Sequence, residues 1–87
     1  MTEIELFYGI MCPYCRTAKK MVKKIMKENP DQFTLTETLI SSPIGMIKRY
    51  KLGIHAVPTI AINGKIVFRA LPEEEELRKE LNLKKGE

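Results

Sequence analysis

Two cysteines three positions apart are the residues best able to do chemistry in this chain. Cys12 and Cys15 are its only thiols, and Pro13 and Tyr14 stand between them. A purely structural disulfide would be reduced in a cytosol, so this spacing indicates either redox chemistry or metal binding. In disulfide exchange the attacking group is a thiolate, and a free cysteine with a pKa of ~8.5 is only slightly ionised at neutral pH. Redox chemistry therefore requires a position that stabilises the anion.

The residues after Cys12 predict such a position at the start of a helix. Cys12 is expected at the N-cap and Pro13 at the first helical position, where the helix dipole favours an anion by about 0.3–1 kcal/mol, and by up to ~2 kcal/mol when partly buried. Cys15 lies on the same side of the first turn and deeper. We therefore predict that Cys12 attacks a substrate disulfide and that Cys15 resolves the mixed disulfide. The apolar stripe of this helix recurs at helical spacing: Ala18, Met21, Val22, Ile25 and Met26.

Metal binding is the alternative to redox chemistry. A closed zinc site takes four ligands, and the chain offers two cysteines and one histidine, His55. A metal-binding or metal-delivery module would therefore use Cys12 and Cys15 across a dimer, or recruit other donors. His55 itself is expected to be a solvent-facing loop residue. A reading of both cysteines as inert core residues does not explain their place where a strand precedes an amphipathic helix.

The elements that position the cysteines are predicted in the order β-α-β-α-β-β-α. Two strands joined through a helix pair in parallel by a right-handed crossover, and Asn63-Gly64 predicts a hairpin that adds two antiparallel strands. The fold class is therefore α/β, with a four-stranded mixed sheet flanked by three helices. Strands are expected at 3–8, 33–39, 60–62 and 65–69, and helices from Pro13 to about Asn29, from Pro43 to about Tyr50 and from Pro72 to Lys84, Lys85 and Gly86.

The second and third helices also have predicted buried faces. In the helix that begins at Pro43, we expect Ile44, Ile47 and Tyr50 to face inward. In the last helix, Leu77 and Leu81 form the expected buried stripe.

Length and composition limit the remaining possibilities. The 87 residues are enough for one domain, 1–87. The net charge of +4 comes from intermixed lysines and glutamates, which argues against a nucleic-acid partner, and no run approaches the ~20 apolar residues of a membrane span. The N-terminus lacks the basic stretch and apolar run of a secretory signal, so we expect a cytoplasmic protein. We also expect a monomer.

Cys-Pro-Tyr-Cys at 12–15 resembles the active-site motif of glutaredoxins, and Gly53–Thr59 resembles the thioredoxin segment that carries a cis-proline. Over nearly its whole length the chain resembles the thioredoxin/glutaredoxin superfamily, and in particular the compact archaeal redoxins of mixed character. The resemblance implies a thioredoxin fold and a protein-disulfide reductase with a redox-active Cys12–Cys15 disulfide and no other cofactor. It also implies disulfide-containing proteins as partners, with a thioredoxin-reductase-like flavoprotein or a low-molecular-weight thiol as electron donor.

The same resemblance implies a substrate-binding surface. It predicts a cis Val57–Pro58 bond, with Val57 presenting its backbone to an extended substrate. Pro13 would fix the backbone beside the thiols, and Tyr14 would cap the site with its ring. By alignment to a glycine near the thioredoxin substrate groove, Arg69 is expected at the rim of the site, where its planar fork could bind a carboxylate.

The sequence departs from the family pattern at three places. Leu6 stands where thioredoxins carry a buried acid, six positions before the attacking cysteine. The segment 68–72 lacks the glycines with which glutaredoxins grip glutathione, and the segment 9–11 lacks their basic residue. Neither a proton-transfer role at Leu6 nor glutathione as the reductant follows from the resemblance.

Overall fold

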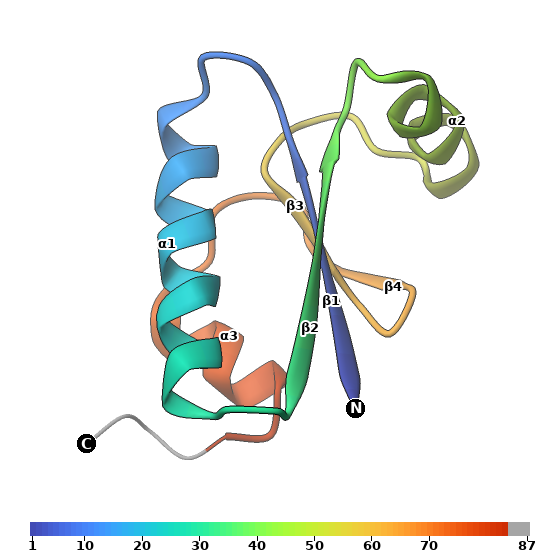
Figure 1. The fold of residues 1–87 in the computed structure, drawn as a ribbon. Coiled ribbons are helices and arrows are strands. Elements are labelled where there is room, and N and C mark those ends of the chain that lie inside the picture. Colours follow the sequence, from blue (N-terminus) through green and yellow to red (C-terminus); the bar gives the residue numbers. More distant parts are fainter. Residues whose placement is uncertain (84–87) are drawn as a thin grey trace.

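Four strands form one mixed sheet in the order β2-β1-β3-β4, shown in Figure 1. The structure is a computed structural model that describes residues 1–83. At its centre β1 (Thr2–Tyr8) pairs in parallel with β2 (Phe33–Leu39) and antiparallel with β3 (Thr59–Ile62), and β4 (Lys65–Phe68) pairs antiparallel with β3. The predicted order of elements and the predicted strand directions are confirmed.

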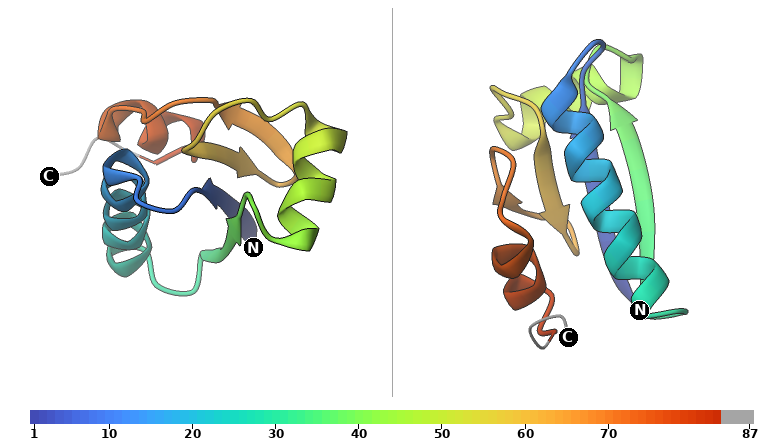
Figure 2. Two further views of the ribbon diagram at one scale, coloured as in Figure 1. Left: turned by 90° about the horizontal axis from the view of Figure 1, so that it is seen from above. Right: turned by 90° about the vertical axis from the view of Figure 1, so that its left-hand side faces the viewer.

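Helices cover both faces of this sheet. Helices α1 (Pro13–Glu28) and α3 (Glu74–Glu80) lie on one face and α2 (Pro43–Leu52) lies on the other, as Figure 2 shows. Apolar side chains from α1, α3 and the strands meet on the first face, and a smaller cluster forms on the face of α2. The larger cluster consists of Ile4, Leu6, Ala18, Val22, Ile25, Phe33, Ile60, Leu77 and Leu81, and the smaller one of Phe7, Ile54 and Ala61.

The predicted inner face of α2 is wrong. Ile44, Ile47 and Tyr50 are 60%, 56% and 91% exposed, so none of the three belongs to the core. The helix itself forms where expected, with Ser42 as its N-cap and Gly53, at φ 66°, as its C-cap. The spacing of apolar residues therefore predicted the helix correctly, but it predicted the wrong side of the helix to face the sheet.

A buried glycine and an ion pair set that rotation. Gly45 is buried so close to the end of β2 that a β-carbon on it would overlap the carbonyl oxygen of Leu39. One turn later, Lys48 Nζ lies 2.8 Å from Glu5 Oε2 on β1. Because Gly45 and Lys48 are three residues apart, both lie on one side of the helix, and this side faces the sheet.

Helix α3 ends earlier than the sequence pattern indicates. Leu77 and Leu81 are buried as predicted, but the helix stops at Glu80, and the predicted closing residues at 84–86 lie outside the described part of the chain. Asn82 takes a left-handed conformation with φ 59°, and the N–H of Leu83 donates to the carbonyl of Arg78 at 2.8 Å. This is the hydrogen-bond pattern of a Schellman motif, for which asparagine is a suitable residue.

A buried arginine fastens α3 to α1. Arg78 is only 5% exposed, and its guanidinium donates to Glu28 Oε1 at 2.7 Å and to Glu74 Oε2 at 2.9 Å. The hydrogen bond to Glu28, followed by that to Glu74, raises the pKa of Arg78 above its usual value. Hydrogen bonds from Arg78 and then Lys24 lower the pKa of Glu74 below 4.5.

Within residues 1–83, no helix has both the length and the apolar content to cross a membrane.

Candidate active site

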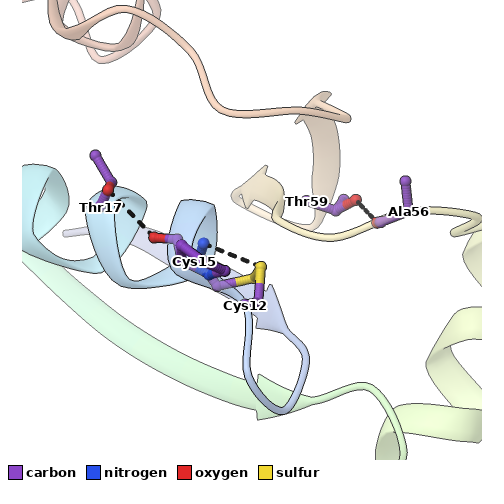
Figure 3. The surroundings of a disulfide bond; sticks show 6 residues. Cys12, Cys15, Thr17, Ala56 and Thr59 are labelled. Atoms are coloured by element: carbon purple, nitrogen blue, oxygen red, sulfur yellow. Dashed lines mark hydrogen bonds between the residues drawn. A yellow bond between two sulfur atoms is a disulfide. The ribbon is translucent and has the colours of Figure 1, made fainter.

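The two cysteines lie where β1 leads into α1, and they form a disulfide (Figure 3). Cys12 is the N-cap residue of α1, with the extended backbone of φ −110° and ψ 103°, and Pro13 begins the helix. The N–H of Cys15 donates to Cys12 Sγ at 3.1 Å. Just before the cap, Met11 adopts a left-handed φ of 55°, which turns the chain from the strand into the helix. The predicted cap position of Cys12 is confirmed.

The two sulfurs differ in their access to solvent. Cys12 is half-buried, whereas Cys15 is 4% exposed and lies on the inner side of α1 with Ala18 and Val22. The Cα atoms of the two cysteines are 5.2 Å apart, within the range that suits a disulfide. A partner molecule can therefore reach Cys12 more readily than Cys15, and the two sulfurs can bond to each other without moving the backbone.

The segment that leads into β3 lies beside the disulfide. The Val57–Pro58 peptide bond is cis, as the resemblance implied, and Pro58 is buried. The buried Thr59 donates from Oγ1 to the carbonyl of Ala56 at 2.7 Å and so closes the turn that holds this bond (Figure 3). A β-carbon on Gly9 would lie 3.1 Å from Cγ2 of Val57, so the segment before Cys12 and the segment before Pro58 touch. Thr59 was not among the residues predicted for the site.

Four of the predicted substrate-binding residues share one cavity. Tyr14, Val57, Pro58 and Arg69 line a cavity of about 380 Å³. Tyr14 is 66% exposed, so its ring is available to a partner. Arg69 donates from Nη1 to the carbonyl of Gly53 at 2.8 Å, which links the end of β4 to the end of α2. Its position next to Tyr14 and Pro58 agrees with the expected rim of the site, and its binding role stays a prediction.

The remaining candidates lie elsewhere. His55 is exposed and lines other cavities with Arg49 and Ile54, apart from the sulfurs. Within the described residues, no three side chains of His, Cys, Asp or Glu are grouped to hold a metal ion.

Leu6 is buried beneath the disulfide, where it lines a second cavity together with Cys12 and Cys15.

Comparisons with known proteins agree with this geometry. A family model described as a thioredoxin domain matches residues 2–82. The thioredoxin of Methanocaldococcus jannaschii is 40% identical over 76 residues, which cover 86% of each chain. A probable thioredoxin of Archaeoglobus fulgidus is 34% identical over 86 residues, which cover 99% of this chain and 92% of the relative.

Solved structures support the same fold. An uncharacterised thioredoxin-like protein from Clostridium perfringens matches with a TM-score of 0.82 at 22% identity, over 94% of this chain and 69% of its own. The oxidised mitochondrial thioredoxin 3 of Saccharomyces cerevisiae matches with a TM-score of 0.74 at 15% identity, over 93% of this chain and 76% of its own. With a disulfide-bonded cysteine pair at the start of α1 and archaeal thioredoxins as relatives, this chain belongs to the thioredoxin family and is a thiol–disulfide oxidoreductase.

Proposed function

We propose that this chain reduces the disulfides of other proteins, with Cys12 as the nucleophile and Cys15 as the resolving thiol. The Cys12 thiolate attacks one sulfur of the substrate disulfide, and the other substrate sulfur leaves as a thiolate. Cys15 then attacks the Cys12 sulfur, which closes the Cys12–Cys15 disulfide and releases the remaining substrate sulfur. Two electrons pass to the substrate, which takes up two protons and ends as a dithiol.

The observation that carries this assignment is the position of Cys12 Sγ at the N-cap of α1. The sulfur accepts the N–H of Cys15 at 3.1 Å, and this amide is one of those that a helix start leaves without an intrahelical partner. The helix dipole acts at the same atom and favours an anion there by about 0.3–1 kcal/mol, or up to ~2 kcal/mol in partly buried geometry. Cys12 is also the more accessible of the two sulfurs.

The cavity next to the disulfide suits an extended segment of a substrate protein. Tyr14, Val57 and Pro58 give it an apolar wall, and the Tyr14 ring is 66% exposed. In the proposal, Val57 presents its backbone to the substrate while Pro13 keeps the first turn of α1 fixed. Apolar side chains on either side of the substrate disulfide would lose contact with water in this cavity, which favours binding.

Arg69 is proposed to bind a carboxylate of the substrate. One guanidinium nitrogen holds the Gly53 carbonyl, and the remaining N–H groups can form a bidentate pair. An exposed ion pair contributes about 0.2–1 kcal/mol, so Arg69→Ala should lower kcat/KM about 1.4- to 5-fold for a disulfide peptide with acidic flanking residues. For a disulfide peptide with neutral flanking residues, Arg69→Ala should have the same kcat/KM as wild type. Equal kcat/KM for wild type and Arg69→Ala with both peptides would refute this role.

The electron donor is proposed to be a thioredoxin-reductase-like flavoprotein rather than glutathione. The segment 68–72 reads Phe-Arg-Ala-Leu-Pro and lacks the flexible glycines associated with glutathione binding in the resembling glutaredoxins. We propose a reducing compartment such as the cytoplasm, which would keep the dithiol form available. We also propose that the protein acts as a monomer, because the two cysteines and the residues that line the adjacent cavity come from one chain. Turnover of an oxidised protein substrate with a flavoprotein reductase, and not with glutathione alone, is the expected result.

Insulin reduction with dithiothreitol as the electron source tests the proposed function. Wild type should accelerate the reaction with a metal chelator present, which a metal-delivery module would not do. Cys12→Ser should abolish the acceleration, and Cys15→Ser should accumulate a mixed disulfide between Cys12 and the substrate that mass spectrometry can locate. Full activity in Cys12→Ser, or a mixed disulfide at the other cysteine in the matched variants, would overturn the assignment.

A further inference from the structure

A carboxylate shares a cavity with the two sulfurs. This cavity has a volume of about 290 Å³ and is lined by Cys12, Cys15, Leu6, Lys19 and Glu37, among others. A single water takes about 30 Å³ of liquid volume, so the cavity has room for several. Among the described residues that line it, Glu37 is the only carboxylate.

The register of the sheet directs Glu37 toward this cavity. Glu37 on β2 is paired with Leu6 on β1, which faces α1 and lies beneath the disulfide. The next residue, Thr38, points to the opposite face, where it donates to Glu5 Oε2 at 2.6 Å. Because successive side chains of a strand alternate between faces, Glu37 lies on the face of α1.

Lys19 holds the carboxylate in place. Lys19 lies one helical turn after Cys15, so the two side chains occupy the same side of α1. Its Nζ is 3.0 Å from Glu37 Oε1, and the two side chains are 45% and 32% exposed. An exposed ion pair of this kind contributes little to the free energy of unfolding. Its main effect here is to orient the carboxylate.

The resolving step creates a need for a proton acceptor. Cys15 is 4% exposed, and burial away from water favours the neutral form of a thiol. Only the thiolate attacks sulfur, so the Cys15 proton must leave before or during the attack on Cys12. Within residues 1–83, Glu37 is the one carboxylate that lines the cavity next to this thiol.

We propose that Glu37 accepts the proton of Cys15, through a water in this cavity, when Cys15 resolves the mixed disulfide. The Cys15–Cys12 bond forms as the bond between Cys12 and the substrate sulfur breaks, and the substrate leaves as a thiolate. The proton held by Glu37 then returns through water to that thiolate, so the step is balanced without a further reactant. Lys19 is a positioning residue that keeps the carboxylate at the cavity. This inference rests on the proposed roles of the two cysteines.

The resolving step can be observed separately from the first attack. Reduced full-length protein is mixed in a stopped-flow instrument with a limiting amount of dithiobis(nitrobenzoic acid), an aromatic disulfide that releases a coloured thiolate. The first release reports attack by Cys12 on the reagent, and the second reports attack by Cys15 on the mixed disulfide. Glu37→Gln keeps the shape of the side chain and removes the base. Glu5→Gln is the matched control, because it breaks an ion pair of 2.8 Å on the opposite face of the sheet.

Glu37→Gln should slow the second release about 10-fold or more near pH 6, because general bases typically contribute about 10²–10⁴-fold. In this variant the rate of the second release should rise about tenfold per pH unit, because hydroxide must ionise the thiol. The wild-type rate should change little between pH 6 and 7.5. The other charged or titratable residues that line this cavity with Glu37 and the two cysteines are Tyr8 from β1 and Arg16 and Lys19 from α1. The first release should be unchanged in both variants.

Two further variants separate a proton acceptor from a structural ion pair. Glu37→Asp should recover part of the rate and the shallow pH profile. Lys19→Met should slow the second release less than Glu37→Gln does, and should add nothing in the double variant. If Glu37→Gln shows the wild-type rate and pH profile in the second release, Glu37 is a surface ion-pair partner only and the inference is wrong. A wild type without a second release would overturn the cysteine roles, and this inference with them.

Discussion

A β-carbon added at Gly45 tests how α2 is docked on the sheet. Gly45→Ala would place that carbon 2.9 Å from the carbonyl carbon of Leu39 and 2.9 Å from Ser42 Oγ, and over the Leu39 carbonyl oxygen. Contacts between carbon atoms are optimal at about 3.5–4.0 Å, so backbone at the end of β2 or the start of α2 must move. Overpacking costs about 1–3 kcal/mol, and loss of the Ser42 cap to the Gly45 N–H costs about 1 kcal/mol. Alanine regains about 1 kcal/mol of helix propensity, which leaves a net loss of about 1–3 kcal/mol.

Urea denaturation measures this loss. A chain of this size has a slope of about 1 kcal/mol per molar urea, so the midpoint for Gly45→Ala should fall by about 1–3 M. Ser42→Ala removes the cap alone and should lose about 1 kcal/mol. Ile44→Ala changes a side chain that is 60% exposed and should stay within about 0.5 kcal/mol of wild type. A Gly45→Ala midpoint equal to or above that of wild type would show that α2 does not pack against β2 as described.

Two further predictions concern the contact of α3 with α1 and the site itself. Arg78→Met should lower the free energy of unfolding by about 1–2 kcal/mol near pH 7, measured by urea denaturation, because the hydrogen bonds of a buried guanidinium to Glu28 and Glu74 are lost. Arg78 and Lys24 lower the pKa of Glu74. The ionised Glu74 carboxylate therefore stabilises the folded state above pH 4.5, and this stabilisation is lost as the pH falls through the lowered pKa. Wild type should therefore lose more stability on acidification than Arg78→Met does, and parallel curves would contradict this. Gly9→Val should displace Val57, because even a β-carbon would lie 3.1 Å from it, and should reduce kcat/KM several-fold for insulin but not for a small aromatic disulfide. Equal effects on both substrates would argue against Val57 as a substrate contact.

Local sequence patterns were sufficient for the order of elements and for the cysteine site. Apolar spacing and Pro13 placed the helix start correctly, and with it the N-cap position of Cys12. Asn63-Gly64 correctly predicted the hairpin, since these residues take φ values of 50° and 83°. The cis bond before Pro58 followed from the family resemblance and could not be derived from the residues alone, because cis is the minority form of such bonds.

Contacts between distant residues account for the errors. Ile44 and Ile47 recur as a buried helix face would, but the tight approach of Gly45 to Leu39 and the reach of Lys48 to Glu5 turn a different side of α2 to the sheet. The early end of α3 depends on Asn82, whose left-handed conformation is available to asparagine but not required of it.

Glu37 stands out in the sequence, although it was not among the predicted site residues. It occupies one face of β2 together with Phe33 and Leu35, and a charge among apolar residues at the same period is unusual on a covered face. What the sequence could not supply is the register that sets Glu37 against Leu6, beneath the disulfide. Arg78 was missed for a similar reason, because its partner Glu28 is 50 positions away.

Alkylation of the reduced protein with iodoacetamide across a range of pH tests the central claim most directly, when mass spectrometry follows each cysteine separately. The helix start should lower the pKa of the Cys12 thiol below the ~8.5 of a free cysteine, so Cys12 should be modified first and at near-neutral pH, while Cys15 stays unmodified. Modification of Cys15 before Cys12, or reaction of Cys12 only above pH 8.5, would contradict the assignment of Cys12 as the attacking thiolate.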